Sequence, residues 1–184
     1  MDTLSNIAIF LIDTLFSLYI SIVVIRFLLA LARASFHNQI SQFIVKATNP
    51  ILFPLRRIIP SIGKIDTSAI VLALALILTK SFLILSLKEA DINLIVLLIY
   101  SVVELVRSVI WIYIIALLIQ AVLSWIANSN SASNPLVGIL YSLTNPILRP
   151  IRNVVPNIGM VDISPFVAIL GLHILLIIVN GLGV

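Results

Sequence analysis

Four arginines in two similar segments are the residues best suited to bind a charged partner. Arg56 and Arg152 recur at equal positions, and Arg57 and Arg149 lie beside them. A guanidinium group offers a planar fork of N–H donors that fits phosphate or carboxylate oxygens. One interpretation is that these arginines bind lipid phosphates or an acidic partner. The other, which we favour, is that they anchor the chain and set its orientation. An anchoring arginine also contacts phosphate, so the two interpretations are compatible.

Each of these segments also carries an aspartate, Asp66 in the first and Asp162 in the second. These carboxylates could be ligands for an ion. We favour a structural role, in which they hold the preceding loop to the start of a helix through backbone N–H groups. Gly63 and Gly159 stand three residues before the aspartates and suit a turn that needs positive φ.

A second group of polar residues interrupts long apolar runs. It comprises Asp13, Arg26, Glu104, Arg107 and Gln120. Ionisable groups inside membrane spans are candidates for function. Glu104 and Arg107 are three apart on one helix face, so we expect them to form a local ion pair. Asp13 and Arg26 are 13 residues apart, roughly 20 Å along a helix, and cannot pair with each other. Arg26 aligns with Gln120, which favours a polar contact between two halves of the chain over a role in conduction or partner binding.

Several classes of chemistry have little support. The chain has no Cys, so disulfides, thiolate metal sites and thiol nucleophiles are excluded. His37 and His173 are the only histidines and are far apart in the sequence, which argues against haem or metal ligation by this chain alone. No catalytic or nucleotide-binding motif is present. We therefore expect no enzyme activity and no cofactor, and the sparse positive charge does not indicate nucleic-acid binding.

The two segments are copies of one pattern, N-P-x-x-x-P-x-R-x-x-x-P-x-x-G-x-x-D-x-S. Its recurrence at a constant offset of 96 residues predicts a tandem duplication with repeats at 1–93 and 94–184. The shared positions are Asn49, Pro50, Pro54, Pro60, Gly63 and Asp66, and then Asn145, Pro146, Pro150, Pro156, Gly159 and Asp162.

Composition identifies the environment in which these segments lie. Of the 184 residues, 61% are hydrophobic and 10% are charged, against roughly 25% charged in an average soluble domain. The mean hydropathy is +1.25. A globule of this size cannot hide so much apolar surface, so the sequence predicts an all-α integral membrane protein.

Four apolar runs are long enough to span a bilayer core of roughly 30 Å. They are Ile7 to Ala32, Ala69 to Leu87, roughly Ser101 to Ala127, and Phe166 to Leu182. Leu94 to Tyr100 either extends the third span or forms a separate segment. Between the spans of each repeat we predict a short interfacial helix, with apolar stripes at Ile40, Phe43, Ile44, Ala47 and at Leu136, Ile139, Leu140, Leu143. The residue before a proline avoids the α region, so Asn49-Pro50 should end the first helix and the Pro-rich segment should follow an extended path.

The distribution of Lys and Arg predicts the orientation of the chain. Basic residues cluster in the two segments between the spans of each repeat, at Arg33, Lys46, Arg56, Arg57, Lys64, Arg149 and Arg152. The other side has Lys88 beside Glu89 and Asp91, together with Asp2. The positive-inside rule then predicts that both Pro-rich segments are cytoplasmic and both termini face outward, in a multi-pass protein of the cell inner membrane.

The doubled N-P-I-L-x-P-x-R…P-x-x-G-x-x-D-x-S pattern, preceded by Ser41-Gln42-Phe43 and followed by apolar spans, resembles the YggT family of bacterial and plastid membrane proteins. The resemblance covers nearly the whole chain. It implies a link to envelope or osmotic stress with effects on ion uptake, as in bacterial members, and to haem attachment or nucleoid distribution, as in plastid relatives. It supplies no catalytic residues.

Two hypotheses about function follow. The chain is either a non-enzymatic membrane protein that assists the assembly or stability of other envelope complexes, or an oligomeric ion-transport component. We favour the first, because four spans are too few for a roomy pore in one chain and no filter-like sequence is present. The expected partners are anionic lipids, other envelope membrane proteins or further copies of the chain, and not nucleic acid.

Overall fold

The computed structural model describes residues 3–34, 36, 38–63, 65–126, 135–155 and 162–182. All the regular elements in these ranges are α-helices. In chain order they are α1 (Thr3–Leu31), α2 (Gln39–Ile58), α3 (Thr67–Leu87), α4 (Leu94–Ile126), α5 (Pro135–Arg152) and α6 (Ser164–Leu182). Of the residues singled out in the sequence, Pro156, Gly159, His37, Lys64 and Asp2 lie outside the described ranges.

Helices α1, α3, α4 and α6 are long and apolar enough to cross a membrane. They have apolar residues on all sides, which is typical of membrane spans. The chain is therefore an all-helical, multi-pass membrane protein, as its composition predicts. Helix α4 runs without interruption for 33 residues, about 50 Å at the α-helical rise. Residues 94–100 thus extend the third span and do not form a separate segment.

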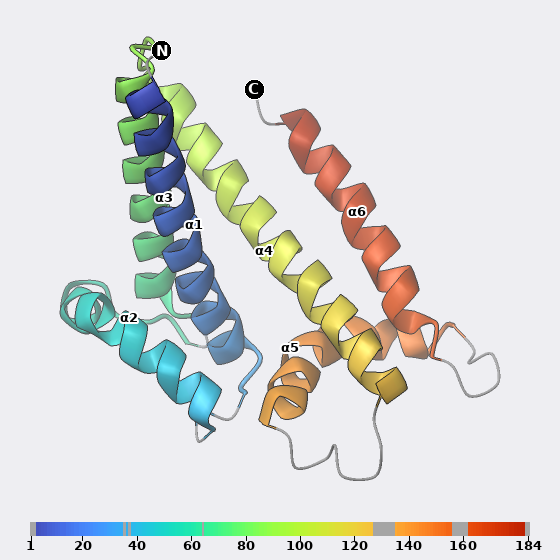
Figure 1. Ribbon diagram of the computed structural model, residues 1–184. Helices are drawn as coiled ribbons and strands as arrows, with labels where there is room; N and C mark the ends of the chain where they lie inside the picture. The colour runs from blue at the N-terminus through green and yellow to red at the C-terminus, as the bar shows by residue number, and fades with distance from the viewer. Residues whose placement is uncertain are drawn as a thin grey trace.

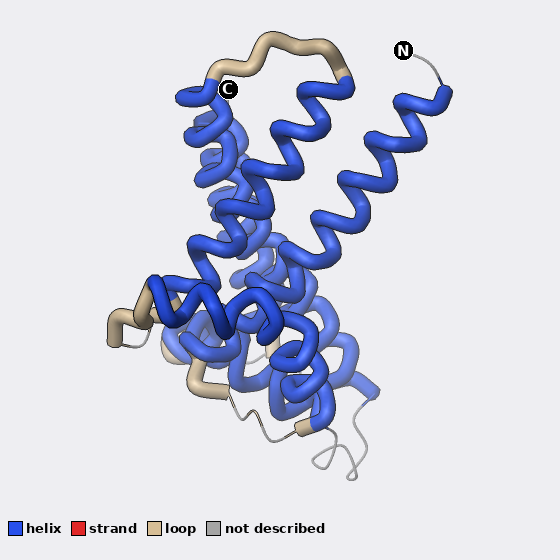
Figure 2. Tube along the Cα trace, turned by 90° about the vertical axis from the view of Figure 1, so that its left-hand side faces the viewer, coloured by secondary structure: helices blue, strands red, loops and turns tan. Residues whose placement is uncertain are grey.

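The spans form two pairs that meet at α3 and α4. Helix α1 packs most extensively against α3, and α4 packs against α6; among the described helices, α6 contacts only α4 and α5. Both chain termini and the turn between α3 and α4 lie at one end of the molecule, and α2 and α5 lie across the other end (Figure 1). A view from the side shows the same separation of the connecting turn from the two crossing helices (Figure 2).

The crossing helices are longer than the sequence predicts. Helix α2 continues through Pro50 and Pro54, and α5 continues through Pro146 and Pro150. The prediction that Asn49-Pro50 ends the helix is therefore wrong. All four prolines lie on the exposed face, so the carbonyl groups that lose a backbone partner are not buried. The opposite face is packed against the spans, and this packing offsets the cost of a proline in a helix interior, roughly 3 kcal/mol.

The buried stripe of each crossing helix also differs from the predicted stripe. In α2 the buried residues are Ser41, Ile44, Thr48 and Leu52, whereas Phe43 is 64% exposed. In α5 they are Ile139, Leu140, Leu143, Thr144 and Leu148, and Leu136 is exposed. Gln39, Gln42 and Lys46 are exposed, as expected for the polar face of an interfacial helix. The three small hydroxyl residues, Ser41, Thr48 and Thr144, were missed because periodicity arguments count only apolar side chains.

Each crossing helix closes a small core with the spans beside it. Leu52 of α2 is fully buried in a cluster with residues of α1 and α3, among them Val23, Leu28 and Ile77. Leu148 of α5 is fully buried with Leu117 of α4 and Ala168 of α6. Burying a leucine side chain contributes roughly 1.5–3 kcal/mol. These contacts hold both amphipathic helices firmly on the bundle, and so fix the positions of the arginines near their ends.

Candidate functional site

The arginine near the end of α2 forms an ion pair with the aspartate that begins α3. Arg56 Nη2 donates to Asp66 Oδ2, and the carboxylate is nearly buried while the guanidinium is partly exposed. Asp66 is also the N-cap of α3, since its Oδ1 accepts from the Ala69 backbone N–H at 3.4 Å. The structural role predicted for Asp66 is confirmed, and Arg56 proves to be its partner.

The same arrangement recurs at the end of α5. Arg152 Nε donates to Asp162 Oδ2 at 2.9 Å, and Asp162 Oδ1 accepts from the Ser164 backbone N–H at 2.9 Å. Partial burial raises the pKa of Asp162, but the hydrogen bonds from Ser164 and Arg152 outweigh that effect and leave the pKa below its ordinary value. Two of the four arginines are therefore engaged by carboxylates of the chain itself.

The loop between α2 and α3 is tied down by short-range hydrogen bonds. Ile62 and Ile65 exchange backbone hydrogen bonds of 3.1 and 3.0 Å across a tight turn. Gly63 lies in that turn with φ of +60°, the positive value predicted for it. Ser68 Oγ donates to the Ile59 carbonyl at 2.8 Å. Together these bonds hold Asp66 within reach of Arg56.

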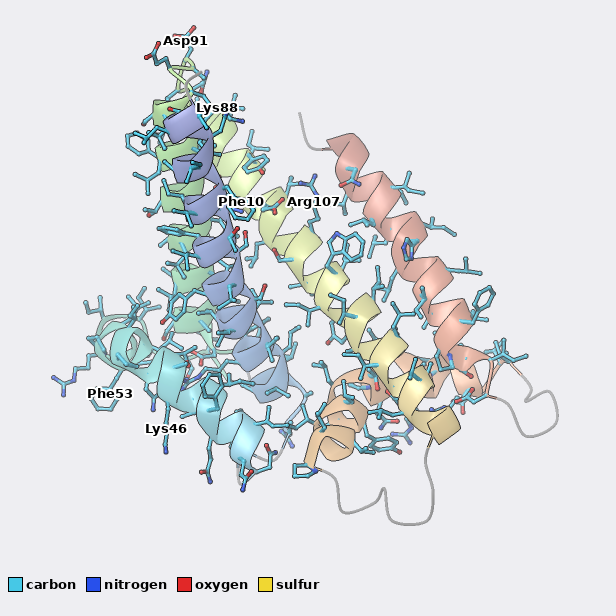
Figure 3. All side chains as sticks on the ribbon, in the orientation of Figure 1. Phe10, Lys46, Phe53, Lys88, Asp91 and Arg107 are labelled. Atoms are coloured by element: carbon cyan, nitrogen blue, oxygen red, sulfur yellow. The ribbon has the colours of Figure 1, made fainter. Side chains whose placement is uncertain are left out.

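Arg57 and Arg149 differ from their neighbours, because neither forms an ion pair within the described residues. Arg57 lies over the ring of Phe53, 5.3 Å from its centroid, which is a cation–π arrangement. Phe53 and Lys46 point away from the spans on the outer side of α2 (Figure 3). We call the outward faces of α2 and α5 the basic platform, with Phe43, Lys46, Phe53, Arg57, Tyr141 and Arg149 as its exposed members.

Arg26 is buried and bonds to α2. Only 5% of its surface is exposed, and its Nη1 donates to the Val45 carbonyl at 3.2 Å and to Thr48 Oγ1. Gln120 similarly shares a hydrogen bond with Thr144 of α5. Each side chain therefore joins a span to the crossing helix that follows it. The expected contact between Arg26 and Gln120 across the two halves is not made, because each finds a closer threonine partner.

At the other end of the bundle, Glu104 and Arg107 form the predicted ion pair, at 2.6 Å. Arg107 also donates through Nε to Asn180 Oδ1 of α6 at 2.9 Å. Figure 3 shows Arg107 on α4, on the side that faces α6. The pair therefore connects the third and fourth spans as well as neutralising its own charge.

The sequence analysis missed one intramembrane charge, Lys80. Lys80 is 7% exposed, and its Nζ donates to Asp13 Oδ1 and Ser17 Oγ, each at 3.1 Å. Asp13 thus has a counter-ion on α3, in place of the Arg26 that lies too far along α1. Two signals could have found it: Lys80 is the one charged residue in an otherwise apolar run, and a charge inside a span calls for a partner at similar depth.

His173 lies on α6 and is exposed. Its Nδ1 is 2.9 Å from the Ile169 carbonyl, and its ring meets Trp111 of α4 edge to face with 6.3 Å between ring centroids. These contacts describe a histidine that packs two spans together. They do not by themselves indicate a ligand.

Comparison with known proteins gives consistent matches over the full chain. The family model described as CCB3/YggT matches residues 5–87 and 92–183. An uncharacterized protein of Pseudomonas aeruginosa is 40% identical over 186 residues, covering 100% of this chain and 93% of that protein. The uncharacterized protein YggT of Escherichia coli K12 is 33% identical over 175 residues, covering 95% and 88% respectively. The uncharacterized protein ycf19 of Guillardia theta is 36% identical over 72 residues, covering 39% of this chain and 78% of that protein. No solved structure matches.

Proposed function

The chain belongs to the CCB3/YggT family, and from this premise we propose that it is a non-enzymatic inner-membrane protein that supports other envelope complexes, notably under osmotic stress. The observation that carries the proposal is the basic platform. Two amphipathic helices are packed rigidly across one end of four spans, with aromatic and basic side chains on their outer faces. Such faces bind the headgroup region of a membrane and the proteins that lie beside it.

The arrangement supports scaffolding because the charged side chains inside the spans all have partners within the chain. Among the described residues, three ion pairs join neighbouring segments, namely Arg56–Asp66, Arg152–Asp162 and Lys80–Asp13, and a fourth, Glu104–Arg107, lies within α4. Groups held in this way stabilise the bundle. Of the basic side chains left for external contacts, Lys46, Arg57 and Arg149 are exposed on the platform, whereas Lys88 lies at the opposite end of the bundle. We propose that this surface faces the cytoplasm and that both termini face outward, in keeping with the positive-inside rule.

The platform also fits a duplicated architecture, with repeats at 1–93 and 94–184. The equivalent contacts at Arg56–Asp66 and Arg152–Asp162, and at Thr48 and Thr144, support this proposal. The match to the ycf19 protein of Guillardia theta supports it too. The 72 matched residues cover 78% of that protein, so its whole length corresponds to about one repeat. Two spans with one crossing helix would then be the basic unit, and its doubling would give a platform with two helices.

The platform proposal is tested by comparing substitutions in two pairs of arginines that look alike in the sequence, Arg57 with Arg149 and Arg56 with Arg152. Arg57→Gln with Arg149→Gln should reduce retention of phosphatidylglycerol in native mass spectra, because each basic residue near an anionic surface contributes about 1 kcal/mol. The thermal midpoint should change little. The matched control, Arg56→Gln with Arg152→Gln, should lower the thermal midpoint and largely keep the lipid. Equal lipid loss in both variants would contradict the proposal.

The supporting role is tested by purification of the tagged chain in mild detergent, before and after an osmotic upshift. We expect a membrane complex to co-purify with the natural chain and to be reduced with the Arg57→Gln, Arg149→Gln variant. Recovery of the same complex with both chains would show that the platform does not recruit it. Recovery of homo-oligomers alone, in both conditions, would contradict the supporting role.

A second candidate function is an oligomeric ion-transport component, and one observation favours it. Lys80 and Asp13 form a charged pair inside the spans beside a cavity of about 530 Å³, and charges inside spans mark ion pathways in many transporters. Flux of K⁺ and H⁺ into liposomes that hold the purified chain tests this candidate. A flux that disappears in the Lys80→Met variant would favour transport over the supporting role.

A further inference from the structure

The cavity of about 530 Å³ lies at the end of the bundle opposite the basic platform, where α3 turns into α4. Lys88 and Asp91 stand at this end of the bundle (Figure 3). The cavity is lined by residues of α1, α3 and α4. Its volume is within the range of small-molecule sites, roughly 300–1,000 Å³.

The lining residues form three layers along the helix axes. Lys80 and Ser81 come about 10 Å deeper along α3 than Lys88, at 1.5 Å per residue. Ile84 and Leu85 lie between these levels. The cavity thus has a polar rim, an apolar belt and a polar floor inside the membrane span.

The floor is rich in unused hydrogen-bond donors. Ser81 is 7% exposed, and its hydroxyl forms no hydrogen bond within the described chain. Other serine hydroxyls on membrane spans, such as those of Ser21 and Ser86, donate to the carbonyl four residues back. The Tyr100 hydroxyl also has no hydrogen-bond partner among the described residues. Lys80 uses two of its three N–H donors, on Asp13 and Ser17.

A hydroxyl that lines a cavity without a partner in the chain can bond to whatever enters that cavity. On the floor, Asp13 Oδ1 already accepts from Lys80 and from Ser17 Oγ. The third N–H of Lys80 is a pure donor, and the Ser81 and Tyr100 hydroxyls can donate as well as accept. The three groups together can therefore hold a ligand that brings oxygen acceptors. The rim carries both signs of charge, since Lys88 has an ammonium group and Asp91 a carboxylate. Asn93, whose Oδ1 accepts from the Ile95 N–H at 3.0 Å, still has its amide N–H groups.

We propose that this cavity binds the oxyanion of an amphiphile, a phosphate or carboxylate, at the donors of Lys80, Ser81 and Tyr100. The apolar belt contacts the hydrocarbon part of the ligand. Asp13 then acts as an internal competitor, because its carboxylate occupies the ammonium group that the ligand would otherwise engage. The phosphate can be supplied by a membrane lipid or by a soluble molecule, and the chemistry of the floor is the same in both cases.

The test measures ligand binding to the full chain in detergent by native mass spectrometry, with dioleoyl phosphatidic acid, dioleoylglycerol and sodium phosphate as probes. Ser81→Ala and Tyr100→Phe each remove one donor and leave the packing almost unchanged. Each should weaken retention of phosphatidic acid about threefold to tenfold, as expected for loss of one hydrogen bond. Neither should affect dioleoylglycerol, which lacks the oxyanion. Ser86→Ala is the control, since its hydroxyl bonds to Phe82 outside the cavity.

The outcomes distinguish a lipid ligand from a soluble one, and an anionic ligand from a cation. Weaker binding of phosphatidic acid, with sodium phosphate unaffected, supports a lipid ligand, and the reverse supports a soluble one. Asp13→Asn should strengthen binding of the phosphate probe because it frees Lys80. A cation site would instead lose its carboxylate ligand in that variant, and weaker binding there would overturn the proposal. Because Asp13→Asn is expected to be less stable, Ser81→Ala and Tyr100→Phe provide an independent test. If both variants bind phosphatidic acid and sodium phosphate as the natural chain does, the proposal is overturned.

Discussion

Arg26 and Gln120 occupy matching places in the two halves of the molecule, 94 residues apart, and each bonds to a fully buried threonine on the next crossing helix. Arg26 donates to Thr48 Oγ1, which in turn donates to the Ile44 carbonyl at 2.7 Å. Thr144 Oγ1 shares its proton between the Gln120 side-chain amide oxygen and the Leu140 carbonyl, the latter at 2.8 Å. A charged and a neutral side chain therefore perform one structural task. Neither needs the other, since each bond is made within its own half.

This relationship predicts that Arg26→Gln is tolerated. A glutamine at this position has the reach that Gln120 shows, and its neutral amide is cheaper to bury than a guanidinium group. We expect the free energy of unfolding to change by about 1 kcal/mol or less, as for an exchange of one hydrogen bond for another. Arg26→Glu should cost about 3 kcal/mol or more, because it buries a negative charge against the Val45 carbonyl.

The measurement is the thermal midpoint in detergent, followed by the intrinsic fluorescence of the chain's two tryptophans. Gln120→Glu is the matched control in the second half and should be destabilising too. If Arg26→Gln were as damaging as Arg26→Glu, the charge itself would be required and the proposed equivalence with Gln120 would be wrong.

Asp66 has two tasks that substitutions can separate. It caps α3 through the Ala69 N–H and pairs with Arg56. Asp66→Asn can keep the cap but loses the ion pair, whereas Asp66→Ala loses both. We expect Asp66→Ala to cost about 1 kcal/mol more than Asp66→Asn, the usual value of an N-cap. Comparison of the two thermal midpoints checks this, and equal midpoints would mean that the cap contributes nothing.

Asp162 predicts an acid-sensitive contribution to stability. Its pKa is below its ordinary value in the folded chain despite partial burial, because of the bonds from Ser164 and Arg152. A depressed carboxyl pKa stabilises the fold above the ordinary pKa, which is about 3.9, and this contribution is lost as the pH falls through the folded value. The thermal midpoint should therefore decrease when the pH is lowered below about 4. Asp162→Asn should be less stable than the natural chain at pH 7, and the difference should shrink at pH 3. A difference independent of pH would contradict the assignment.

The sequence predicts the parts of this structure that depend on local patterns. The positive φ of Gly63, the capping by Asp66 and the i, i+3 pair of Glu104 and Arg107 all follow from residues close together in the chain. The boundaries of α1, α3 and α6 are close to the predicted ones for the same reason, since hydropathy is local, whereas α4 begins at Leu94 and not near Ser101. These features require no knowledge of which helix packs on which.

The features that the sequence did not predict depend on tertiary packing. Pro50 and Pro54 lie inside α2 because the opposite face of that helix is buried on α1 and α3. Lys80 and Asp13 are 67 residues apart, so their pairing depends on how α1 and α3 pack. The pairing of Arg56 with Asp66 was not predicted, because the two residues lie at the ends of different helices.

The orientation of the chain is predicted from charge and can be tested by labelling. The natural chain has no cysteine, so single cysteines can be introduced at Ser61, Ser86 and Asn153 without a prior substitution. All three positions are exposed. In spheroplasts, an impermeant maleimide should label only Ser86→Cys, at the end of α3. The other two should react only after lysis. Labelling of Ser61→Cys and Asn153→Cys in intact spheroplasts would reverse the orientation.

The last prediction concerns the energetics of the Lys80–Asp13 pair. The Lys80 side chain is 9% exposed and the Asp13 side chain is 56% exposed, so the two partners bury unequal amounts of charge. Asp13→Asn leaves a nearly buried ammonium group without its counter-ion, which in buried pairs costs about 3–5 kcal/mol. Lys80→Met removes the buried charge, and the carboxylate that remains is the more exposed of the two. It should therefore cost less than Asp13→Asn. The double variant removes both charges and should be more stable than Asp13→Asn alone, with a coupling energy of about 1–3 kcal/mol. The thermal midpoints of the natural chain, the two single variants and the double variant complete this double-mutant cycle. Additive losses in the double variant would mean that the pair is not coupled and that Lys80 is stabilised by its surroundings instead.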